Sequence, residues 1–237
     1  MDIHLVIGSF GQDGRLLKAS LKKNNKVVFG VARRKSDGEK NFCYADVAEK
    51  QQLLNVLNHT NPSHIYFFAG ISVNDNSVSL DEHRLQYLHP IQICAQWALR
   101  QNHIVNIAVA SSILIYGHQV GHITEGKDFL PVGNYAQTRV ETIEYCNRLI
   151  GENINVAFCV FGGHESALRD KKFLFGKIMQ SFLGQKIPLP KYCLTDRRDW
   201  GYAPEYMEIV ETICGKNGLF NIVTGQNFAV GQVLSWF

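Results

Sequence analysis

Short apolar runs alternate with helical patterns along the first two thirds of the chain, and few folds accommodate this alternation. The runs are the expected strands, at residues 4–7, 27–32, 64–68, 104–110 and 155–161. The helical patterns fall between them, at residues 14–24, 47–58, 83–101 and 135–150. Strands joined by helices form a parallel sheet with right-handed crossovers. We therefore predict a Rossmann-type, doubly wound α/β fold whose ligands bind beyond the carboxyl ends of the strands.

The pattern changes after residue 161, where prolines become more frequent and the apolar runs shorter. Helical stretches are expected near residues 171–183 and 204–214, with a short strand near 220–223. We predict a nucleotide-binding Rossmann domain over residues 1–162 and a small substrate lobe over residues 163–237.

Composition excludes several classes of protein. The 237 residues are 46% hydrophobic and 19% charged, which suits a folded core and not a disordered chain. The formal net charge is only +3, without the clustered basic face of a nucleic-acid-binding protein. Apolar runs fall far short of the roughly 20 residues that span a bilayer, and the N-terminus does not resemble a signal peptide. A cytoplasmic protein is expected.

Cysteine and histidine spacings give no metal site. Six cysteines are scattered without a C-x-x-C pair, and we expect free, mostly buried thiols. His118 and His122 have the spacing of two ligands on a helix, but Gly117 and Gly121 disfavour a helix there.

A glycine-rich turn, Gly8-Ser9-Phe10-Gly11-Gln12-Asp13-Gly14, directly follows the first expected strand and opens the first helix. Such glycines allow a tight turn and let the backbone approach a pyrophosphate at the helix N-terminus. The turn predicts dinucleotide binding, although a purely structural turn has the same composition.

Basic residues at the end of the second strand favour NADP(H) over NAD. Arg33 and Arg34, followed by Lys35, stand where an acidic residue would accept the ribose hydroxyls of NAD. An ordinary solvated turn is the alternative. Asp46 follows the next short apolar stretch and lies either beside the adenine or at the start of a helix.

The glycine spacing and several motifs resemble the extended short-chain dehydrogenase/reductase family, and within it the GDP-mannose 4,6-dehydratases and their nucleotide-sugar relatives. The matching segments are Gly8-x-x-Gly11-Gln12-Asp13-Gly14, Arg33-Arg34-Lys35-Ser36, Ser111-Ser112 ahead of Tyr116-Gly117, Tyr135, His164-Glu165-Ser166, and Arg197-Arg198-Asp199-Trp200-Gly201. They extend over nearly the whole chain.

The resemblance implies roles for particular residues. Tyr135 takes the position of the catalytic acid/base, and Ser112 that of the hydroxyl that contacts the sugar. The cofactor positions are Gly8, Phe10, Gly11, Gln12, Asp13, Gly14, Arg33, Arg34, Asp46, Val47, Ala69 and Gly70, and the substrate positions are Ser72, His164, Glu165, Lys177 and Arg198. The resemblance places His164-Glu165 in a turn of the substrate lobe and Arg198 in a loop near the substrate diphosphate. For Arg198 the structural alternative is a salt bridge to Asp199 or a neighbouring acid, and for Lys177 it is a solvated position on an amphipathic helix. A homodimer or homotetramer is expected, built on helices 83–101 and 135–150.

Three positions depart from the pattern of these relatives. Arg139 stands four residues after Tyr135, where the family has a lysine that lowers the pKa of the tyrosine and holds the nicotinamide ribose. Leu114 replaces the glutamate that removes a proton in 4,6-dehydration, and a positioned general base contributes about 10²- to 10⁴-fold. Gly163 stands where relatives usually carry an asparagine.

Three hypotheses remain open from the sequence. The first is an NADP(H)-dependent reductase of a 4-keto sugar linked to GDP, which needs Tyr135 and Ser112 but no base at Leu114. The second is a 4,6-dehydratase with another base, such as Glu125 or His118. The third is a catalytically degenerate nucleotide-binding partner or regulatory subunit.

Overall fold

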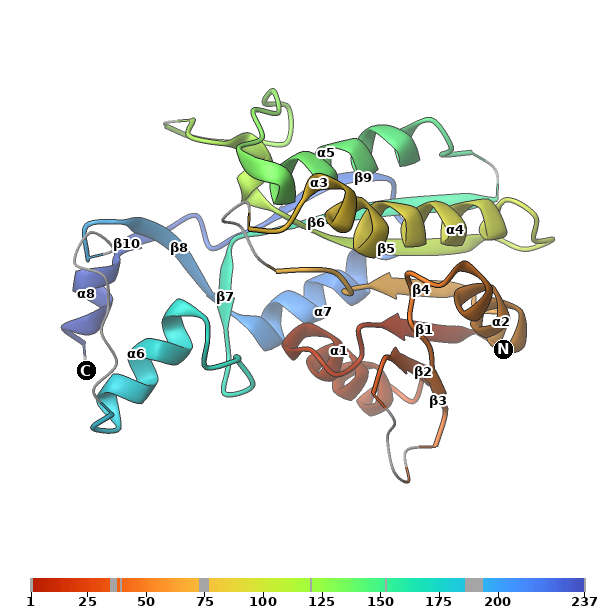
Figure 1. Ribbon diagram of the computed structural model, residues 1–237, viewed down its shortest axis with the longest axis horizontal. Coiled ribbons are helices and arrows are strands. Elements are labelled where there is room, and N and C mark those ends of the chain that lie inside the picture. Colours follow the sequence, from red (N-terminus) through yellow and green to blue (C-terminus); the bar gives the residue numbers. More distant parts are fainter. Residues whose placement is uncertain are drawn as a thin grey trace.

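Seven parallel strands form the central sheet of the computed structural model, in the order β3-β2-β1-β4-β5-β6-β9 (Figure 1). The structure describes residues 2–34, 38, 40–72, 77–119, 121–151, 153–185 and 194–236. The strands are β1 (Ile3–Ile7), β2 (Val27–Ala32), β3 (Phe42–Tyr44), β4 (His64–Phe67), β5 (Val105–Ser112), β6 (Ile154–Phe161) and β9 (Gly218–Ile222). Strands β2 and β3 are added on one side of β1, and β4 and the later strands on the other side. The strand order therefore reverses at the boundary between β1 and β4 in the sheet. The predicted Rossmann-type fold is confirmed.

Helices cover both faces of this sheet and bury two apolar cores. Helices α1 (Gln12–Lys23) and α7 (Ala203–Ile213) pack together on one face, where Leu17, Leu21, Met207 and Val210 are buried. The other face carries α2 (Lys50–Thr60), α4 (His89–Ala98) and α5 (Gly133–Asn147). Because both faces are covered, the strands are short apolar runs without polar alternation.

The helical segment before α4 has an irregular geometry that periodicity does not predict. A capping box at Ser79 starts the short helix α3 (Leu80–His83), which continues as a π-helical turn, η1 (Arg84–Leu88), into α4. The expected single helix over residues 83–101 is therefore three consecutive segments. A π-helical turn widens the helix locally and is frequent at functional sites.

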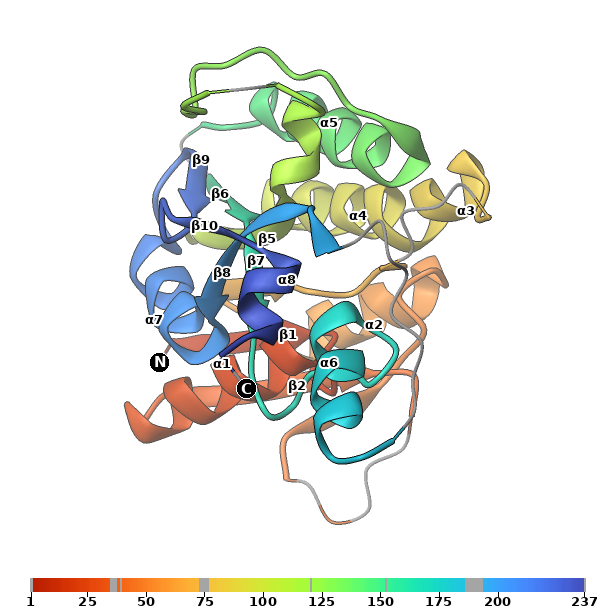
Figure 2. The same ribbon diagram turned by 90° about the vertical axis from the view of Figure 1, so that its left-hand side faces the viewer.

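A small lobe lies at the end of the large sheet toward which its strands point (Figures 1 and 2). It contains a second sheet of order β10-β8-β7 and two helices. Its elements are β7 (Gly163–Glu165), α6 (Leu174–Phe182), β8 (Arg197–Tyr202), β10 (Asn227–Ala229) and α8 (Val230–Leu234). The expected turn at His164-Glu165 and the expected loop at Arg198 are thus strands, because each pairs with a neighbour in this sheet.

Residue 162 marks where the chain first leaves the large sheet, but two later elements return to it. Helix α7 packs against α1, and β9 pairs in parallel with β6. The residues after 162 therefore contribute to both parts of the molecule.

The two helices on which a dimer is expected bury many of their apolar residues within the chain itself. Ile91, Cys94, Trp97, Ala98, Val140 and Ile143 are buried in the core between α4, α5 and the sheet. The oligomeric state stays a prediction. Every helix in the described part of the chain is too short or too polar to cross a lipid bilayer.

The cysteines of the described residues are free thiols, as expected. Cys94, Cys146 and Cys159 are buried, and Cys43 and Cys214 are half-buried. Cys193, like Lys35, lies outside the described residues.

Candidate active site

The glycine-rich turn has steric reasons for two of its glycines. Gly8 adopts a φ of +86°, and a Cβ there would lie 2.8 Å from the Ala69 nitrogen. A Cβ on Gly14 would lie 2.4 Å from the Gly8 carbonyl oxygen. Gly11 is the N-cap of α1 and has no side chain to occupy the amides of the first turn. Those amides and the helix dipole form a favourable site for a diphosphate.

Arg33 and Asp46 lie together beyond the ends of β2 and β3. Arg33 Nη1 is 3.8 Å from Asp46 Oδ2, and the Asp46 carboxylate also accepts a hydrogen bond from the Ala48 amide. The carboxylate therefore caps the turn that precedes α2, whose own N-cap is Glu49. Arg34 is exposed beside them. Lys35 lies outside the described residues.

Other predicted cofactor residues have packing roles. Phe10 stacks on Phe42 with ring centroids 5.2 Å apart. Val47 is buried in the core. Ser72, predicted at the substrate, is exposed.

Arg139 and Tyr135 meet on one face of α5, as their spacing of four residues requires. The Arg139 guanidinium carbon lies 3.9 Å from the Tyr135 ring centroid and 3.7 Å from that of Tyr87. Only 5% of the Arg139 surface is exposed, and among the described residues its Nε and Nη1 have no hydrogen-bond partner. A Cβ on Gly70 would lie 3.4 Å from Arg139 Nη2. The structure thus brings Gly8, Ala69, Gly70 and Arg139 together.

Tyr87 was missed by sequence reasoning, because an aromatic residue in an apolar helix is ordinarily core. The π-helical turn carries its ring over Arg139, and its hydroxyl donates a hydrogen bond to the Ala110 carbonyl oxygen. His83 contacts Tyr135 edge-on, with ring centroids 5.9 Å apart. Burial and then the charge of Arg139 lower the pKa of His83. The cation is therefore enclosed by aromatic rings, which stabilise a desolvated guanidinium.

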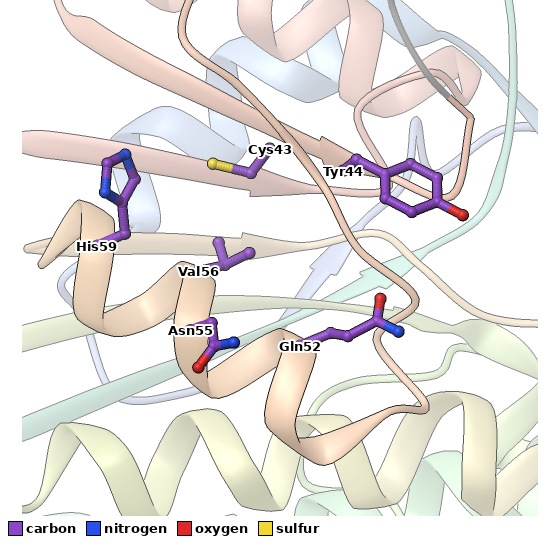
Figure 3. Close-up of a pocket in the computed structure, with 6 residues that line it drawn as sticks. All are labelled: Cys43, Tyr44, Gln52, Asn55, Val56 and His59. Carbon is purple, nitrogen blue, oxygen red and sulfur yellow. The ribbon is translucent and has the colours of Figure 1, made fainter.

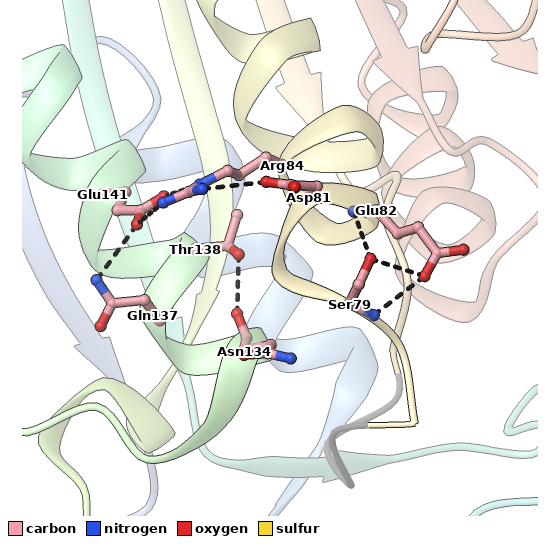
Figure 4. Close-up of polar contacts among 8 residues, drawn as sticks. All are labelled: Ser79, Asp81, Glu82, Arg84, Asn134, Gln137, Thr138 and Glu141. Atoms are coloured by element: carbon pink, nitrogen blue, oxygen red, sulfur yellow. Dashed lines mark hydrogen bonds and ion pairs between the residues drawn. The ribbon is translucent and has the colours of Figure 1, made fainter.

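Polar contacts fix the helix that carries Tyr135 and Arg139 (Figure 4). Arg84 in η1 donates to both carboxylate oxygens of Glu141 in α5, at 2.8 and 2.7 Å. Asn134 donates to the Val78 carbonyl oxygen at 3.0 Å. Both contacts cross from α5 to the segment that carries Tyr87.

Ser112 ends β5 at the carboxyl edge of the sheet, and α5 packs against this region. Its oxygen accepts a hydrogen bond from the Leu114 amide at 3.3 Å, at the start of the 3-10 helix η2 (Ile113–Tyr116). The hydroxyl proton is still available for a ligand. Leu114 is 36% exposed and cannot take a proton.

Glu125, the alternative base for dehydration, is hydrogen-bonded to the backbone of the large sheet. Its carboxylate accepts a hydrogen bond from the Asn221 amide of β9 at 2.9 Å, while the Asn221 side chain accepts from Tyr116. Glu125 therefore fastens the loop after η2 to the sheet. His118 is exposed on the same loop.

His164 is directed at the glycine-rich turn. It is 8% exposed, and its Nε2 lies 3.0 Å from Asp13 Oδ1. Gln12 donates to the His164 carbonyl oxygen at 3.1 Å. The predicted cofactor residues Gln12 and Asp13 are therefore joined to a predicted substrate residue.

Glu165 and Trp200 line a cavity of about 410 Å³ within the small lobe. The rest of its wall comes from Ser166, Ala167, Phe175, Gly201, Tyr202, Val233 and Trp236. Burial raises the pKa of Glu165 to about 6. The charge of Arg169, whose Nε lies 3.1 Å from Glu165 Oε2, opposes this rise. Among the described residues the buried Trp200 Nε1 has no hydrogen-bond partner.

Arg198 and Lys177 are not part of that cavity wall. Arg198 is half-exposed on β8 and pairs with Asp196 at 3.7 Å, which agrees with the plain structural alternative of a local ion pair. Lys177 is half-buried on α6. Gly163 has a steric reason to be glycine, since a Cβ would lie 2.6 Å from the Asp199 carbonyl oxygen.

A second cavity, of about 420 Å³, lies between β3 and α2 (Figure 3). It is lined by Cys43, Tyr44, Gln52, Asn55, Val56 and His59, none of which is a predicted site residue. Within the described residues, no group of three or more His, Cys, Asp or Glu side chains is arranged to hold a metal ion.

The residues at the carboxyl ends of β1, β2 and β4 suit a dinucleotide. Gly8 and Gly14 leave no room for side chains, and the amides of the first turn of α1 suit phosphate. The unpartnered donors of Arg139 suit an acceptor such as a ribose hydroxyl.

Comparison with known proteins agrees with this geometry. The sequence profile of the NAD dependent epimerase/dehydratase family matches residues 4–223. The chain belongs to this family. The resemblance read from the motifs is thereby confirmed.

This epimerase/dehydratase has curated relatives at low identity. It is 26% identical to a GDP-mannose 4,6-dehydratase of Sinorhizobium fredii, over 99% of the chain and 75% of that protein. It is also 26% identical to a GDP-mannose 4,6 dehydratase of Drosophila melanogaster, over 97% of the chain and 66% of that protein. The chain therefore spans about two thirds to three quarters of these relatives.

Solved structures share the fold. A UDP-glucose 4-epimerase from Thermotoga maritima superposes with a TM-score of 0.88 at 17% identity, over 98% of this chain and 80% of that one. MoeE5 in complex with UDP-glucose and NAD gives a TM-score of 0.86 at 20% identity, over 99% and 80% of the two chains.

Proposed function

We propose that this epimerase/dehydratase reduces a 4-keto-6-deoxy sugar linked to a nucleotide, with NADPH as the hydride donor. The observation that carries the proposal is the buried Arg139 guanidinium, stacked on Tyr135 with donors left for a ligand. The relatives named as GDP-mannose 4,6-dehydratases support GDP as the nucleotide.

The residues of the chain divide the reaction between them. The first turn of α1 binds the cofactor diphosphate, and Arg139 donates to the nicotinamide ribose. When bound, NADPH supplies the hydride that adds to the C4 carbonyl carbon of the sugar. Tyr135 gives its hydroxyl proton to the carbonyl oxygen, and Ser112 donates a hydrogen bond to the same oxygen. The permanent charge of Arg139 favours the tyrosinate that remains.

Leu114 is the reason to prefer reduction over dehydration. Elimination of water across C5 and C6 needs a base for the C5 proton, and leucine supplies none. Glu125 is occupied by the Asn221 amide. The names of the curated relatives favour the 4,6-dehydratase as the second candidate, which predicts a water-loss product from GDP-mannose.

NADP(H) is the cofactor that Arg33 and Arg34 favour, since guanidinium groups bind phosphate in a bidentate manner. MoeE5 and other solved neighbours hold NAD, so the choice needs a direct test. For the substrate, we propose that the aromatic wall of the small-lobe cavity accepts the nucleobase and that Arg198 and Lys177 attract the diphosphate.

Thermal shift with NADPH and NADH tests the cofactor, because a ligand that binds only the folded state raises the apparent stability. We expect greater stabilisation by NADPH, and a smaller difference between the two cofactors in Arg33→Ala. Equal or greater stabilisation of the wild type by NADH would contradict the choice of NADP(H).

Consumption of NADPH in the presence of a GDP-4-keto-6-deoxy sugar tests the reaction. Tyr135→Phe keeps the ring beneath Arg139 but lacks the transferable proton, so we expect turnover to fall by about 10²- to 10⁴-fold with cofactor binding retained. Unchanged turnover in Tyr135→Phe would remove Tyr135 from the mechanism, and activity in neither protein would favour a non-catalytic partner.

A further inference from the structure

His164 has hydrogen-bond acceptors at both of its ring nitrogens. Its Nδ1 lies 2.9 Å from the Gly162 carbonyl oxygen, and its Nε2 lies 3.0 Å from Asp13 Oδ1. The same Asp13 oxygen accepts a hydrogen bond from Gln12 Nε2 at 3.2 Å. A neutral imidazole has only one N–H, whereas an imidazolium has two. Only the protonated ring can donate to both the carbonyl and an ionised Asp13.

The other groups around His164 leave Asp13 as its counter-ion. Tyr206 of α7 stacks on the imidazole with ring centroids 5.4 Å apart, and Phe161 of β6 lies on it at 4.7 Å. Glu165, the next residue, forms its ion pair with Arg169. Asp199 of β8 accepts a hydrogen bond from Tyr206 and two from the Thr224 and Gly225 amides.

Burial and, to a smaller extent, the charge of Arg169 lower the pKa of His164. The hydrogen bond and charge of Asp13, together with the hydrogen bond to the Gly162 carbonyl, outweigh them, and the net shift is upward from 6.5. For Asp13, burial raises the pKa, while the hydrogen bond and charge of His164 bring it below 3.8. Both directions agree with an ionised pair in which both N–H groups of the His164 ring donate.

This pair joins two parts of the molecule that are 151 residues apart in sequence. Asp13 lies in the first turn of α1, and His164 lies in β7 of the small lobe. Two further hydrogen bonds join the same two segments. Gln12 donates to the His164 carbonyl oxygen and accepts from the Ser166 hydroxyl at 3.0 Å. The first turn of α1 is therefore held by the lobe that would carry the substrate.

We propose that His164 is a positioning residue that works as an imidazolium, neutralising Asp13 and holding the first turn of α1 in shape to bind the cofactor diphosphate. The proposal rests on the proposed cofactor-binding function and adds its dependence on one proton. If His164 loses that proton, the Asp13 carboxylate is left without a counter-ion beside two bound phosphates, and the Gly162 carbonyl or Asp13 loses its donor.

Cofactor binding and protonation of His164 are thermodynamically linked, so the cofactor affinity should depend on pH. A bound diphosphate raises the pKa of His164, and each unit of that rise corresponds to a tenfold loss of cofactor affinity as the pH increases through the titration. We expect a loss of at least about tenfold between pH 6.5 and pH 9.5. The 2′-phosphate of NADPH, with a second pKa of about 6, completes its ionisation near the lower end of this range. NADH lacks this group, so a step seen with both cofactors does not come from the 2′-phosphate.

Nitrogen NMR of the histidine rings, without cofactor, tests the charge state directly. We expect His164, assigned by comparison with His164→Gln, to be protonated at both nitrogens at pH 7. A single protonated nitrogen at pH 6.5 would overturn the proposal whatever the chain binds.

Fluorescence titration with NADPH and with NADH, from pH 6.5 to pH 9.5, tests the coupling. We expect the affinity step in the wild type and in the control His122→Gln, whose residue is exposed on a loop. His164→Gln and Asp13→Asn should bind more weakly at pH 6.5 and show no step. Asp13→Asn keeps the size of the side chain but removes both effects of Asp13 that raise the pKa of His164. Burial is a larger effect than the remaining hydrogen bond to the Gly162 carbonyl, so we expect His164 of this variant to stay neutral.

The outcomes separate the two proposals. A wild-type affinity without a step, or a step retained in both variants, would overturn the coupling and leave cofactor binding intact. If neither NADPH nor NADH binds at any pH, the proposed function and the coupling are both overturned. The NMR result still decides the charge state of His164.

Discussion

Arg139 is a buried cation without a carboxylate partner among the described residues, and this arrangement favours ligand binding over stability. Burial of the charge and of the unpartnered Nε and Nη1 groups destabilises the folded state more than the two ring contacts stabilise it. Apolar replacements of buried charges are often stabilising. We expect Arg139→Met to raise the free energy of unfolding without cofactor by about 1 kcal/mol and to abolish measurable NADPH binding. Urea denaturation and cofactor titration of the same samples check this; a large loss of stability would mean that Arg139 is mainly structural.

Arg139→Lys is the matched variant that keeps the charge. An ammonium cannot fill the space between the Tyr87 and Tyr135 rings as a planar guanidinium does. We expect kcat/KM to fall by about tenfold, the loss of one good cation–π contact. An increase in activity would show that arginine is only a poor substitute for the lysine of relatives.

Residues whose roles depend only on their neighbours in the sequence were predictable. Gly8 and Gly14 follow from the turn itself, and Tyr135 with Arg139 follows from helical spacing. The pairing of His164 with Asp13 was not predictable, because it depends on how β7 is placed against α1. The sequence therefore predicts Asp13 and His164 as separate site residues but does not predict that they form a pair.

At the scale of elements, the capping box at Ser79 starts the segment that carries His83 and Tyr87 toward Arg139. The Ser79 hydroxyl accepts from the Glu82 amide at 3.2 Å, and Glu82 accepts from the Ser79 amide at 3.0 Å (Figure 4). We expect Ser79→Ala to lower the free energy of unfolding by about 1 kcal/mol, and Ser79→Asp, which keeps an N-cap acceptor, to lower it less. Thermal denaturation measures both; equal losses would exclude the cap as the cause.

Strands β1, β2, β4, β5 and β6 were predictable because each is a short apolar run between two helix-covered faces. The three-residue strand β3 was not predicted, and β9 was expected in the small lobe. Strands β7, β8 and β10 were not predictable, since they are short and β8 begins with Arg197-Arg198-Asp199. Their strand geometry comes from pairing with partners that are distant in sequence, a context that dominates strand preference. The π-helical turn at Arg84–Leu88 likewise leaves no mark on the apolar periodicity.

For the whole molecule, two buried histidines respond to pH in opposite directions. Burial, followed by the charge of His64, lowers the pKa of His4 to about 4, whereas the pKa of His164 is raised. Stability from neutral His4 is complete above its unfolded pKa of 6.5 and is lost as the pH falls toward 4. Stability from His164 is complete below 6.5 and is lost as the pH rises through its folded pKa.

We therefore expect the wild type to lose about 1 to 3 kcal/mol of unfolding free energy through His4 between pH 7 and pH 4. His4→Phe should lose less over this range, and the control His89→Phe, altered at an exposed position of α4, should behave as the wild type. Denaturant titrations at several pH values measure this. An identical acid response in His4→Phe and the wild type would contradict it.

Isotope transfer gives the sharpest test of hydride transfer to a nucleotide-linked 4-keto sugar. The purified protein is incubated with a GDP-4-keto-6-deoxy sugar and NADPH deuterated at both C4 positions, and the sugar product is analysed by mass spectrometry. We expect a sugar product that has gained one deuterium and one hydrogen. An unchanged sugar, from protein shown to be folded and bound to NADPH, would contradict the proposed reduction.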